Sequence, residues 1–519
     1  MTCPQIRDAV AAETKTEGTG IIMADQPPTS RAVRQPTYAQ AIFPLVLLVV
    51  LIAASVYLYG LDALNGPLQV ALIVCSMVTG LNIVRNGHTW EEIDEAGKRG
   101  LSSIVSAIFI LLAIGALIGA WNMSGTIPTL VYYGIQWIDP NWYYLTTAIV
   151  CGAVSLSIGS SWTTAGTIGV GLVGIASLVG VSPVITAGAV VSGSYLGDKV
   201  SPLSETTVLS AQLAGADLYK HIRAQVWTSG PAFLIAVVVF ALIGLFGRGV
   251  GAPPAPTSAE LGRLDQLFWI TPLNLIPLLA LIVMSVKKVP SALAIMAAAL
   301  LAGIVGAFLQ PAAIQRFLGE ASLTPLASVK AVWQAMATGF KESSGIKEVD
   351  ALLSRGGMES MLKTIWLIIA AVNFGALLEE FGMLAKLIDP VLARAHTTGR
   401  LLATTAITAL GLNIVAADQY IALVLPTRMF RLEFQRRGLA PQMLSRAAAD
   451  AGTVTSPLVP WNSCGAYMAA VLGIPTILYL PFCIFNLMSP ILTVLYGFTG
   501  FKILRVAPTD ADTRRPSAA

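Results

Sequence analysis

Long stretches without a single charged side chain are the feature that most limits how this chain can fold. Eight such stretches, without any Asp, Glu, Lys or Arg, cover residues 35–61, 63–84, 100–138, 140–197, 224–247, 267–286, 289–315 and 451–501. A bilayer crossing needs about 20 apolar residues, and the longest stretch has 197 − 140 + 1 = 58. Charged residues are 12% of the 519, about half the share in soluble domains. This composition argues against a soluble, disordered or fibrous chain.

The lengths of these stretches predict an all-α polytopic membrane protein with about 10–14 transmembrane helices. Shorter candidate crossings lie at residues 364–378 and 401–417. A transmembrane β-barrel is excluded, because the apolar stretches are continuous and do not alternate with polar residues. The polar ends, residues 1–36 and 504–519, are expected to be disordered cytoplasmic tails.

The sequence divides into two halves with matching features in the same order. We predict a first transmembrane repeat at 37–247, a Pro/Ala/Gly-rich linker at 248–266 and a second repeat at 267–503. Residues 115–121 (GALIGAW) match 375–381 (GALLEEF), an offset of 375 − 115 = 260. The tripeptide Ser-Pro-Leu at 201–203 recurs at 456–458, an offset of 456 − 201 = 255. Similar offsets in the same order predict a duplicated unit.

Basic residues predict how the halves are oriented. Arg31 and Arg34 precede the first span, which places the N-terminus in the cytoplasm. Lys287 and Lys288 instead follow the first span of the second half, which places the end of that span in the cytoplasm. The two repeats are therefore expected to be inverted relative to each other, with both termini cytoplasmic.

Clusters of Pro, Gly, Ser and Thr inside the apolar stretches predict discontinuous helices. Such breaks survive in a membrane only where they line a cavity, and in transporters they bind the substrate. The most informative cluster, 192–207, contains Asp198, Lys199 and Glu205. A charge at mid-membrane costs roughly 2.5–3.5 kcal/mol, and a bound cation or proton would neutralise it. We therefore predict a site at which Na⁺ and H⁺ compete for one carboxylate. The alternative is that these charges cap a span at a cytoplasmic loop.

A second carboxylate, Asp418, lies alone between Arg400 and Arg428 in an otherwise apolar stretch. It is read as an ion ligand or proton carrier, and the alternative is a helix-end carboxylate paired with an arginine. Glu379 and Glu380 end another apolar stretch and either mark the membrane surface or belong to the site.

Neutral oxygen donors near these carboxylates complete the candidate ion- and substrate-binding set. With Asp198, Glu205 and Asp418, we predict contributions from Ser201, Ser204, Thr206, Thr207, Asn413, Ser456, Asn462 and Ser463. A second group of candidates comprises Ser160, Thr163, Lys199, Glu379, Glu380 and Thr455. Hydroxyl, carbonyl and carboxylate oxygens suit a small hard cation, so Na⁺ is expected near Asp198 and Asp418.

Signatures of other chemistry are absent from the sequence. It has no GxxxxGK[ST] loop for ATP, no GxSxG or HExxH hydrolase motif and no CxxC. The three histidines are far apart, so a resident metal is not expected. We therefore expect a secondary transporter with no cofactor, and not an enzyme.

Several of these segments resemble one known family. Residues 193–207 (GSYLGDKVSPLSETT) are similar to the signature stretch of the NhaC-type Na⁺/H⁺ antiporter family, within the ion transporter superfamily. Residues 455–465, 496–500, 115–128 and 159–166 resemble it as well. Glu205 departs from the family, which often has Asp there. The resemblance implies a multi-pass antiporter of the cell inner membrane with inverted repeats, and a homodimer by analogy.

The leading hypothesis is exchange of cytoplasmic Na⁺ or Li⁺ for external H⁺ by alternating access. The alternative is Na⁺- or H⁺-coupled exchange of a small organic anion or amino acid, since the family includes malate/lactate exchangers. Lys199 would then act as a counter-charge. A channel or membrane scaffold is the third hypothesis, and matching breaks in both halves argue against it.

Overall fold

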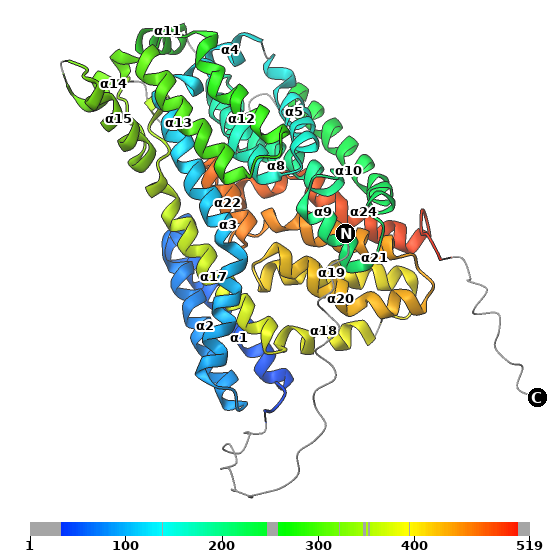
Figure 1. Ribbon diagram of the computed structural model, residues 1–519. Helices are drawn as coiled ribbons and strands as arrows, with labels where there is room; N and C mark the ends of the chain where they lie inside the picture. Colours follow the sequence, from blue (N-terminus) through cyan, green and yellow to red (C-terminus); the bar gives the residue numbers. More distant parts are fainter. Residues whose placement is uncertain are drawn as a thin grey trace, which may run out of the picture.

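The computed structural model describes residues 33–506 apart from 138, 247–257, 321, 346–348, 351, 352 and 394 (Figure 1). These residues form helices joined by turns, and the only β-structure among them is an isolated bridge between Leu439 and Arg505. Both predicted tails lie almost entirely outside the described residues. The all-α prediction is confirmed.

Seven helical segments of the described chain are long and apolar enough to cross a bilayer: α1 (Tyr38–Tyr59), α2 (Pro67–Arg85), α3 (Trp90–Met123), α10 (Leu218–Phe246), α13 (Ser291–Leu309), Met358–Glu380, which contains α17 (Leu362–Glu380), and α19 (Thr398–Val415). An eighth is a pair bent by 91°, Ser463–Leu472 with Thr476–Phe482. Large apolar side chains such as Tyr57 and Phe246 are exposed on their outer faces, as expected of surfaces that contact lipid. The polytopic membrane fold is therefore confirmed.

This number is lower than the predicted 10–14 because many apolar stretches fold as shorter pieces. The longest charge-free stretch, 140–197, is filled by α5 (Tyr143–Ile158), α6 (Ser161–Thr164), α7 (Val170–Leu178) and most of α8 (Pro183–Val200), whereas α4 (Thr126–Trp137) ends before it begins. The last stretch contains α22 (Ser463–Leu472), α23 (Thr476–Tyr479) and α24 (Ile484–Thr499). The sequence length alone does not separate a full crossing from two half-helices.

The first pair of breaks has the same local form in both halves. α5 ends at Gly159, whose φ of 79° is left-handed, and the next residue, Ser160, caps α6. α19 is followed by Ala417, whose φ is 56°, and by Asp418, which caps α20 (Gln419–Arg436). In each case a left-handed residue turns the chain, and a side-chain oxygen then satisfies backbone N–H groups of the next helix.

The second pair of breaks is at the two Ser-Pro-Leu segments. One joins α8 to α9 (Glu205–Ala214). The other follows α21 (Pro441–Ala448) and a π-helical segment, η6 (Ala449–Thr453), and forms a 3₁₀ turn (Ser456–Leu458) before α22. Ser463 N donates to the carbonyl oxygen of Ala417 at 3.0 Å, so the two breaks of the second half touch. The inverted relation of the halves stays a prediction.

Close packing of α5 and α8 brings the first two breaks together. At Gly197 an added Cβ would overlap the backbone of Ser155, and Gly193 is equally tight against Ala148. Small residues let helix backbones approach in this way inside membranes. The end of α8 is thereby held next to the break at Gly159 and Ser160.

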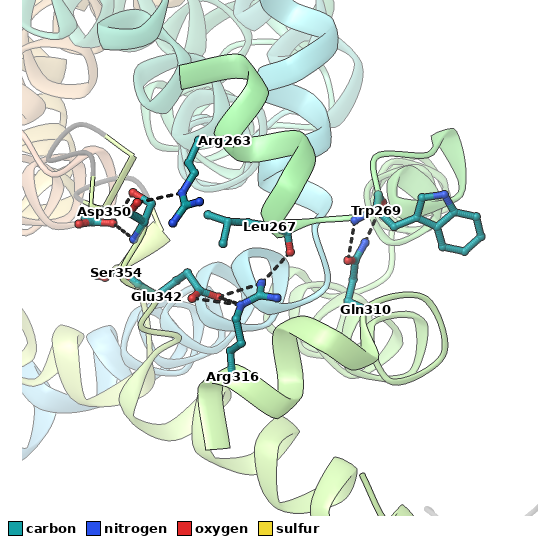
Figure 2. A network of polar contacts seen from close by, with 9 residues as sticks. Arg263, Leu267, Trp269, Gln310, Arg316, Glu342, Asp350 and Ser354 are labelled. Atoms are coloured by element: carbon teal, nitrogen blue, oxygen red, sulfur yellow. Dashed lines mark hydrogen bonds and ion pairs between the residues drawn. The ribbon is translucent and has the colours of Figure 1, made fainter. Parts of the chain in front are cut away.

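Polar contacts hold a peripheral layer of shorter helices together (Figure 2). Arg263 on α11 (Ser258–Leu267) donates to the Ser344 carbonyl at 2.9 Å. Arg316 on α14 (Pro311–Leu318) pairs with Glu342 at 3.1 Å and donates to the Leu267 carbonyl at 2.6 Å. Within the predicted linker 248–266, residues 258–266 are helical, and buried Leu264 anchors α11. Residues 248–257 lie outside the described residues.

The remaining helices complete the described chain. They are α12 (Ile276–Val286), α15 (Pro325–Thr338) and α18 (Met383–Ala393), with short helical turns at Gly60–Asn65, Pro140–Trp142, Pro272–Leu275, Met358–Met361 and Leu480–Phe482 and a π-helical segment at Ala165–Gly169. α17 runs beside α2 and α3 (Figure 1).

Candidate functional site

A cavity of about 710 Å³ lies where the breaks of the two halves meet. Its acidic and aromatic lining comes from both halves, and α3 and the turn between α12 and α13 complete the wall. Its polar, charged and aromatic lining includes Ser160, Ser161, Trp162, Asp198, Glu205, Thr206, Lys288, Asp418, Gln419, Tyr420 and Ser463. Glu205 and Lys288 are exposed, whereas Asp198 and Asp418 are 9% and 3% exposed. The cavity therefore runs from an exposed mouth to two buried carboxylates.

Asp198 is on the last turn of α8, and hydroxyl groups surround its carboxylate. Ser161 Oγ donates to one carboxylate oxygen at 2.5 Å. Ser204 Oγ lies 3.0 Å and Thr206 Oγ1 3.4 Å from the other. Hydrogen bonds to a charged acceptor are stronger than neutral ones, so these hydroxyls stabilise a charge that the membrane interior otherwise disfavours.

The main-chain carbonyl of Asp198 accepts from two of these hydroxyls and from a third, that of Thr207. Ser204 Oγ, Thr206 Oγ1 and Thr207 Oγ1 lie 2.7, 2.9 and 2.9 Å from it. A carbonyl oxygen has two lone pairs, so three hydroxyls converge on two acceptor positions. The result is a compact group of five oxygens: this carbonyl, one carboxylate oxygen and the three hydroxyls. Such a group can turn its lone pairs toward a small hard cation.

Asp418 occupies the N-cap position of α20. Its Oδ1 accepts hydrogen bonds from the backbone N–H groups of Tyr420 at 2.8 Å and Ile421 at 3.0 Å. The positive end of the helix dipole favours a negative charge at this position. The preceding residue, Ala417, adopts a left-handed conformation without being glycine, and strain of this kind tends to persist at functional sites.

Glu205 stands at the mouth of the cavity as the first residue of α9. Its side chain is exposed, and Tyr420 OH donates to its carboxylate at 3.3 Å. Since Tyr420 follows Asp418 by two residues, this bond connects the first-half carboxylate at the mouth with the second-half break. Ser463, 5% exposed, lines the cavity from the start of α22.

Most of the other predicted oxygen donors brace the breaks from behind. Asn413 Nδ2 donates to the Gly452 carbonyl at 2.7 Å and to Thr455 Oγ1 at 2.9 Å. Asn462 Nδ2 donates to Asn413 Oδ1 at 3.1 Å. Ser456 Oγ donates to Gln419 Oε1 at 3.0 Å. These side chains hold the second-half breaks in shape and do not line the cavity.

Two predicted hydroxyls of the first half also act behind the cavity surface. Ser201 Oγ donates to the Leu156 carbonyl at 2.9 Å, and Thr163 Oγ1 donates to Ser160 Oγ at 3.0 Å. Ser160 lines the cavity, whereas Thr163 does not.

Three charged candidates lie away from the cavity. Glu380 is exposed and pairs with Arg99 at 3.0 Å, as a carboxylate at the membrane surface does. Glu379 is half-buried and does not line the cavity. Lys199 points into the protein interior, where it forms an ion pair with Asp450. It is therefore not placed to meet an anionic substrate in this cavity.

Three residues now seen in or near the site, Ser161, Tyr420 and Asp450, were not among the predicted site residues. Ser161 lies in a predicted cluster, but the choice among neighbouring hydroxyls depends on the helical phase after the break. Asp450 immediately precedes the charge-free stretch 451–501. Because Arg446 lies only four residues before it, Asp450 looks like part of a charged loop. Asp418 was selected because it is an isolated carboxylate beside apolar sequence, and the same criterion would have selected Asp450.

The cavity is suited to a cation. Three carboxylates (Asp198, Glu205 and Asp418) and one amine (Lys288) line it, a formal balance of 1 − 3 = −2. Among the described residues, no three His, Cys, Asp or Glu side chains gather as a metal-binding group. A cation bound here would depend on hydroxyl and carbonyl oxygens together with single carboxylates.

Comparison with known proteins finds matches to Na⁺/H⁺ antiporters over most of the chain. The sequence model of the Na⁺/H⁺ antiporter family matches residues 36–248 and 216–501. The chain is 34% identical over 464 residues to the Na⁺/H⁺ antiporter NhaC of Alkalihalophilus pseudofirmus, with 89% of this chain and 96% of that protein covered.

Relatives named for organic substrates match to a similar extent. The chain is 33% identical to the malate-2H⁺/Na⁺-lactate antiporter of Bacillus subtilis, covering 90% of this chain and 96% of the relative. It is also 33% identical to the arginine/ornithine antiporter ArcD of Halobacterium salinarum, covering 92% and 95%.

Proposed function

The chain belongs to the Na⁺/H⁺ antiporter family, and we propose that it exchanges cytoplasmic Na⁺ or Li⁺ for external H⁺ across the cell inner membrane. The observation that carries this proposal is the group of oxygens around Asp198, which lies at a helix break beside the cavity and combines a carboxylate with hydroxyls and a main-chain carbonyl. The transported ions are substrates, and the exchange uses no cofactor.

Competition for one carboxylate explains why the two ions are exchanged. Na⁺ binds to the deprotonated carboxylate of Asp198, whereas H⁺ binds to the same oxygens and removes their charge. With either ion bound the carboxylate is neutralised, and with neither bound it carries a bare charge that costs several kcal/mol in the membrane. The site therefore changes sides mainly when it is occupied, which prevents leakage of either ion. Asp418 supplies the second charge that each cycle can neutralise.

The cavity mouth indicates which side of the membrane it faces. Lys288 lies at the mouth, next to Lys287 in the turn between α12 and α13. Basic residues concentrate in cytoplasmic loops. We infer that the described conformation opens to the cytoplasm and that both termini lie there as well.

The size of the cavity supports a second candidate function. A volume of about 710 Å³ far exceeds that of a Na⁺ ion and falls in the range of small-molecule pockets, roughly 300–1,000 Å³. The excess of carboxylates in its lining disfavours a dianion such as malate. If the cargo is organic, a cationic amino acid fits the lining better.

Proteoliposomes containing the purified protein separate these candidates. A pH gradient is imposed, and Na⁺, Li⁺, K⁺, malate, lactate and arginine are added one at a time. We expect Na⁺ and Li⁺ to dissipate the gradient and the matched Asp198→Asn variant to remain silent. Dissipation by an organic substrate alone would overturn the Na⁺/H⁺ proposal, and a fully active variant would remove Asp198 from the site.

A further inference from the structure

A second charged cluster lies outside the cavity, where α8 meets helices of the second half (Figure 1). Lys199 of α8 forms an ion pair with Asp450 of η6, and both side chains are fully buried. Lys199 also donates to Ser489 of α24. Thr228 of α10 donates to Asp450 Oδ1 at 3.2 Å, and Thr493 of α24 donates to the other oxygen. The pair thus joins two elements of each half.

Other charged and titratable groups around the pair make it sensitive to loss of either partner. Arg446 is buried one helical turn before Asp450, and His221 is buried on α10 with its Nδ1 2.7 Å from Ser445 Oγ. Asp450 is thus the carboxylate that faces two buried cations, Lys199 and Arg446, and removing it alone leaves both without a counter-charge. Lys199 and Asp450 are therefore best studied together.

The pair is coupled to the cavity through α8. Successive residues of an α-helix point about 100° apart, so Asp198 faces the cavity while Lys199, its neighbour, points into the second half. The ion pair fixes the rotation of the last turn of α8 about its axis. The direction in which the Asp198 carboxylate points is fixed by the same contact.

The pair is also coupled to the break at Asp418. Asp450 belongs to a π-helical segment, a form that is frequent at functional sites because its widened turn re-aims side chains. The next two residues of this segment, Ala451 and Gly452, accept hydrogen bonds from Asn413 Nδ2 at 3.4 and 2.7 Å. Asn413 lies on the last turn of α19, immediately before the break that leads to Asp418.

We propose that Lys199 and Asp450 form a positioning pair for ion exchange, which sets the placement of the Asp198 break relative to the Asp418 break without touching the ion. The inference rests on the proposed function, since it assigns the pair a role in that site. Residues behind the ligands of an ion orient those ligands, and their loss typically weakens ion binding by about 10- to 100-fold.

The test compares three variants in the pH-gradient assay: Lys199→Met, Asp450→Asn and the double variant, which keeps side chains of similar size without the two charges. We expect Asp450→Asn to unfold at the lowest temperature of the three, because it leaves Lys199 and Arg446 buried without the carboxylate. In the folded double variant the half-saturating Na⁺ concentration should rise by about tenfold or more, with a smaller change in the maximal rate. A double variant with wild-type half-saturation would overturn the proposal, because a purely structural pair leaves the ion site unchanged.

Two further measurements complete the design. If the double variant does not fold, Asp450→Glu separates a positioning role from a purely structural one. This variant keeps the charge but moves the carboxylate outward by one methylene. A positioning role predicts a raised half-saturating Na⁺ concentration, and a structural role predicts the wild-type value. The matched control is Arg316→Met/Glu342→Gln, which removes the peripheral pair of Figure 2 and should leave half-saturation unchanged.

Failure of the inference is distinguishable from failure of the proposed function. The response of the wild-type protein to Na⁺ tests the function, whereas the ratio of variant to wild-type half-saturation tests the pair. If a different substrate dissipates the gradient, the same ratio is measured with that substrate.

Discussion

Replacing Asp418 by Asn and by Ala separates the two roles that the structure assigns to this carboxylate. Both capping bonds, from Tyr420 N and Ile421 N, end on Oδ1, and the Asn side chain keeps an acceptor in that position. Asn caps helices as well as Asp does. Asp418→Asn therefore loses only the favourable interaction of the charge with the helix dipole, about 0.3–1 kcal/mol. Asp418→Ala also loses the cap, a further 0.5–2 kcal/mol or roughly 1 kcal/mol in a typical helix.

The assay pairs thermal unfolding in detergent with exchange in proteoliposomes. We expect Asp418→Asn to unfold close to the wild-type midpoint, Asp418→Ala to unfold below both, and neither variant to exchange Na⁺ for H⁺. Wild-type exchange by Asp418→Asn would refute the reasoning, because Asp418 would then be a helix cap and nothing more. Equal unfolding midpoints of the two variants would show that the capping hydrogen bonds contribute little to the stability of the protein.

Two other predictions use matched pairs of positions within the chain. Gly197→Ala should unfold at a clearly lower temperature than the wild type, because α5 and α8 must separate to admit the methyl group. Gly230→Ala on α10, where an added Cβ meets no atom within 4 Å, should be neutral or stabilise the helix by about 0.5–1 kcal/mol. Thermal unfolding measures both variants, and equal midpoints would contradict the packing of α5 against α8. Ser161→Ala removes a hydrogen bond to a charged group, worth about 1.5–3 kcal/mol. H⁺ should then compete better, and the apparent Na⁺ affinity at fixed pH should fall by about 10- to 100-fold. Ser157→Ala, which removes only a bond to its own helix, should keep the wild-type affinity, and a similar effect at both positions would show that Ser161 has no special relation to the cavity carboxylate.

The membrane fold and the family followed from the sequence because both depend on local features. Charge-free stretches determine which segments can cross a bilayer, and the comparisons confirmed the family that residues 193–207 resemble. Asp198 and Asp418 were singled out for the same reason: a carboxylate inside an apolar stretch is rare and costly. Their presence in one cavity is a finding of the structure.

The sequence could not reveal contacts between distant segments or the phase of a helix after a break. Lys199 and Asp450 are 450 − 199 = 251 residues apart, and no local pattern connects them. Asn413 and Asn462 were predicted either to supply oxygens to the ion or to help shape the site, and only the structure shows that their amide groups hydrogen-bond across the second-half breaks. Ser161, rather than its neighbours Ser160 and Thr163, donates to Asp198, because a shift of one residue along the helix changes the direction of the side chain.

The central claim is that Na⁺ and H⁺ compete for carboxylates at the meeting point of the breaks. Calorimetric titration of the purified protein with Na⁺ at several pH values tests it most directly, with Asp198→Asn as the matched control. Competition with one proton predicts that the apparent Na⁺ dissociation constant rises by about tenfold for each pH unit of acidification below the site's titration, with proton release on binding, and that the control binds no Na⁺. Na⁺ binding that is independent of pH, or unchanged in the control, would contradict the account.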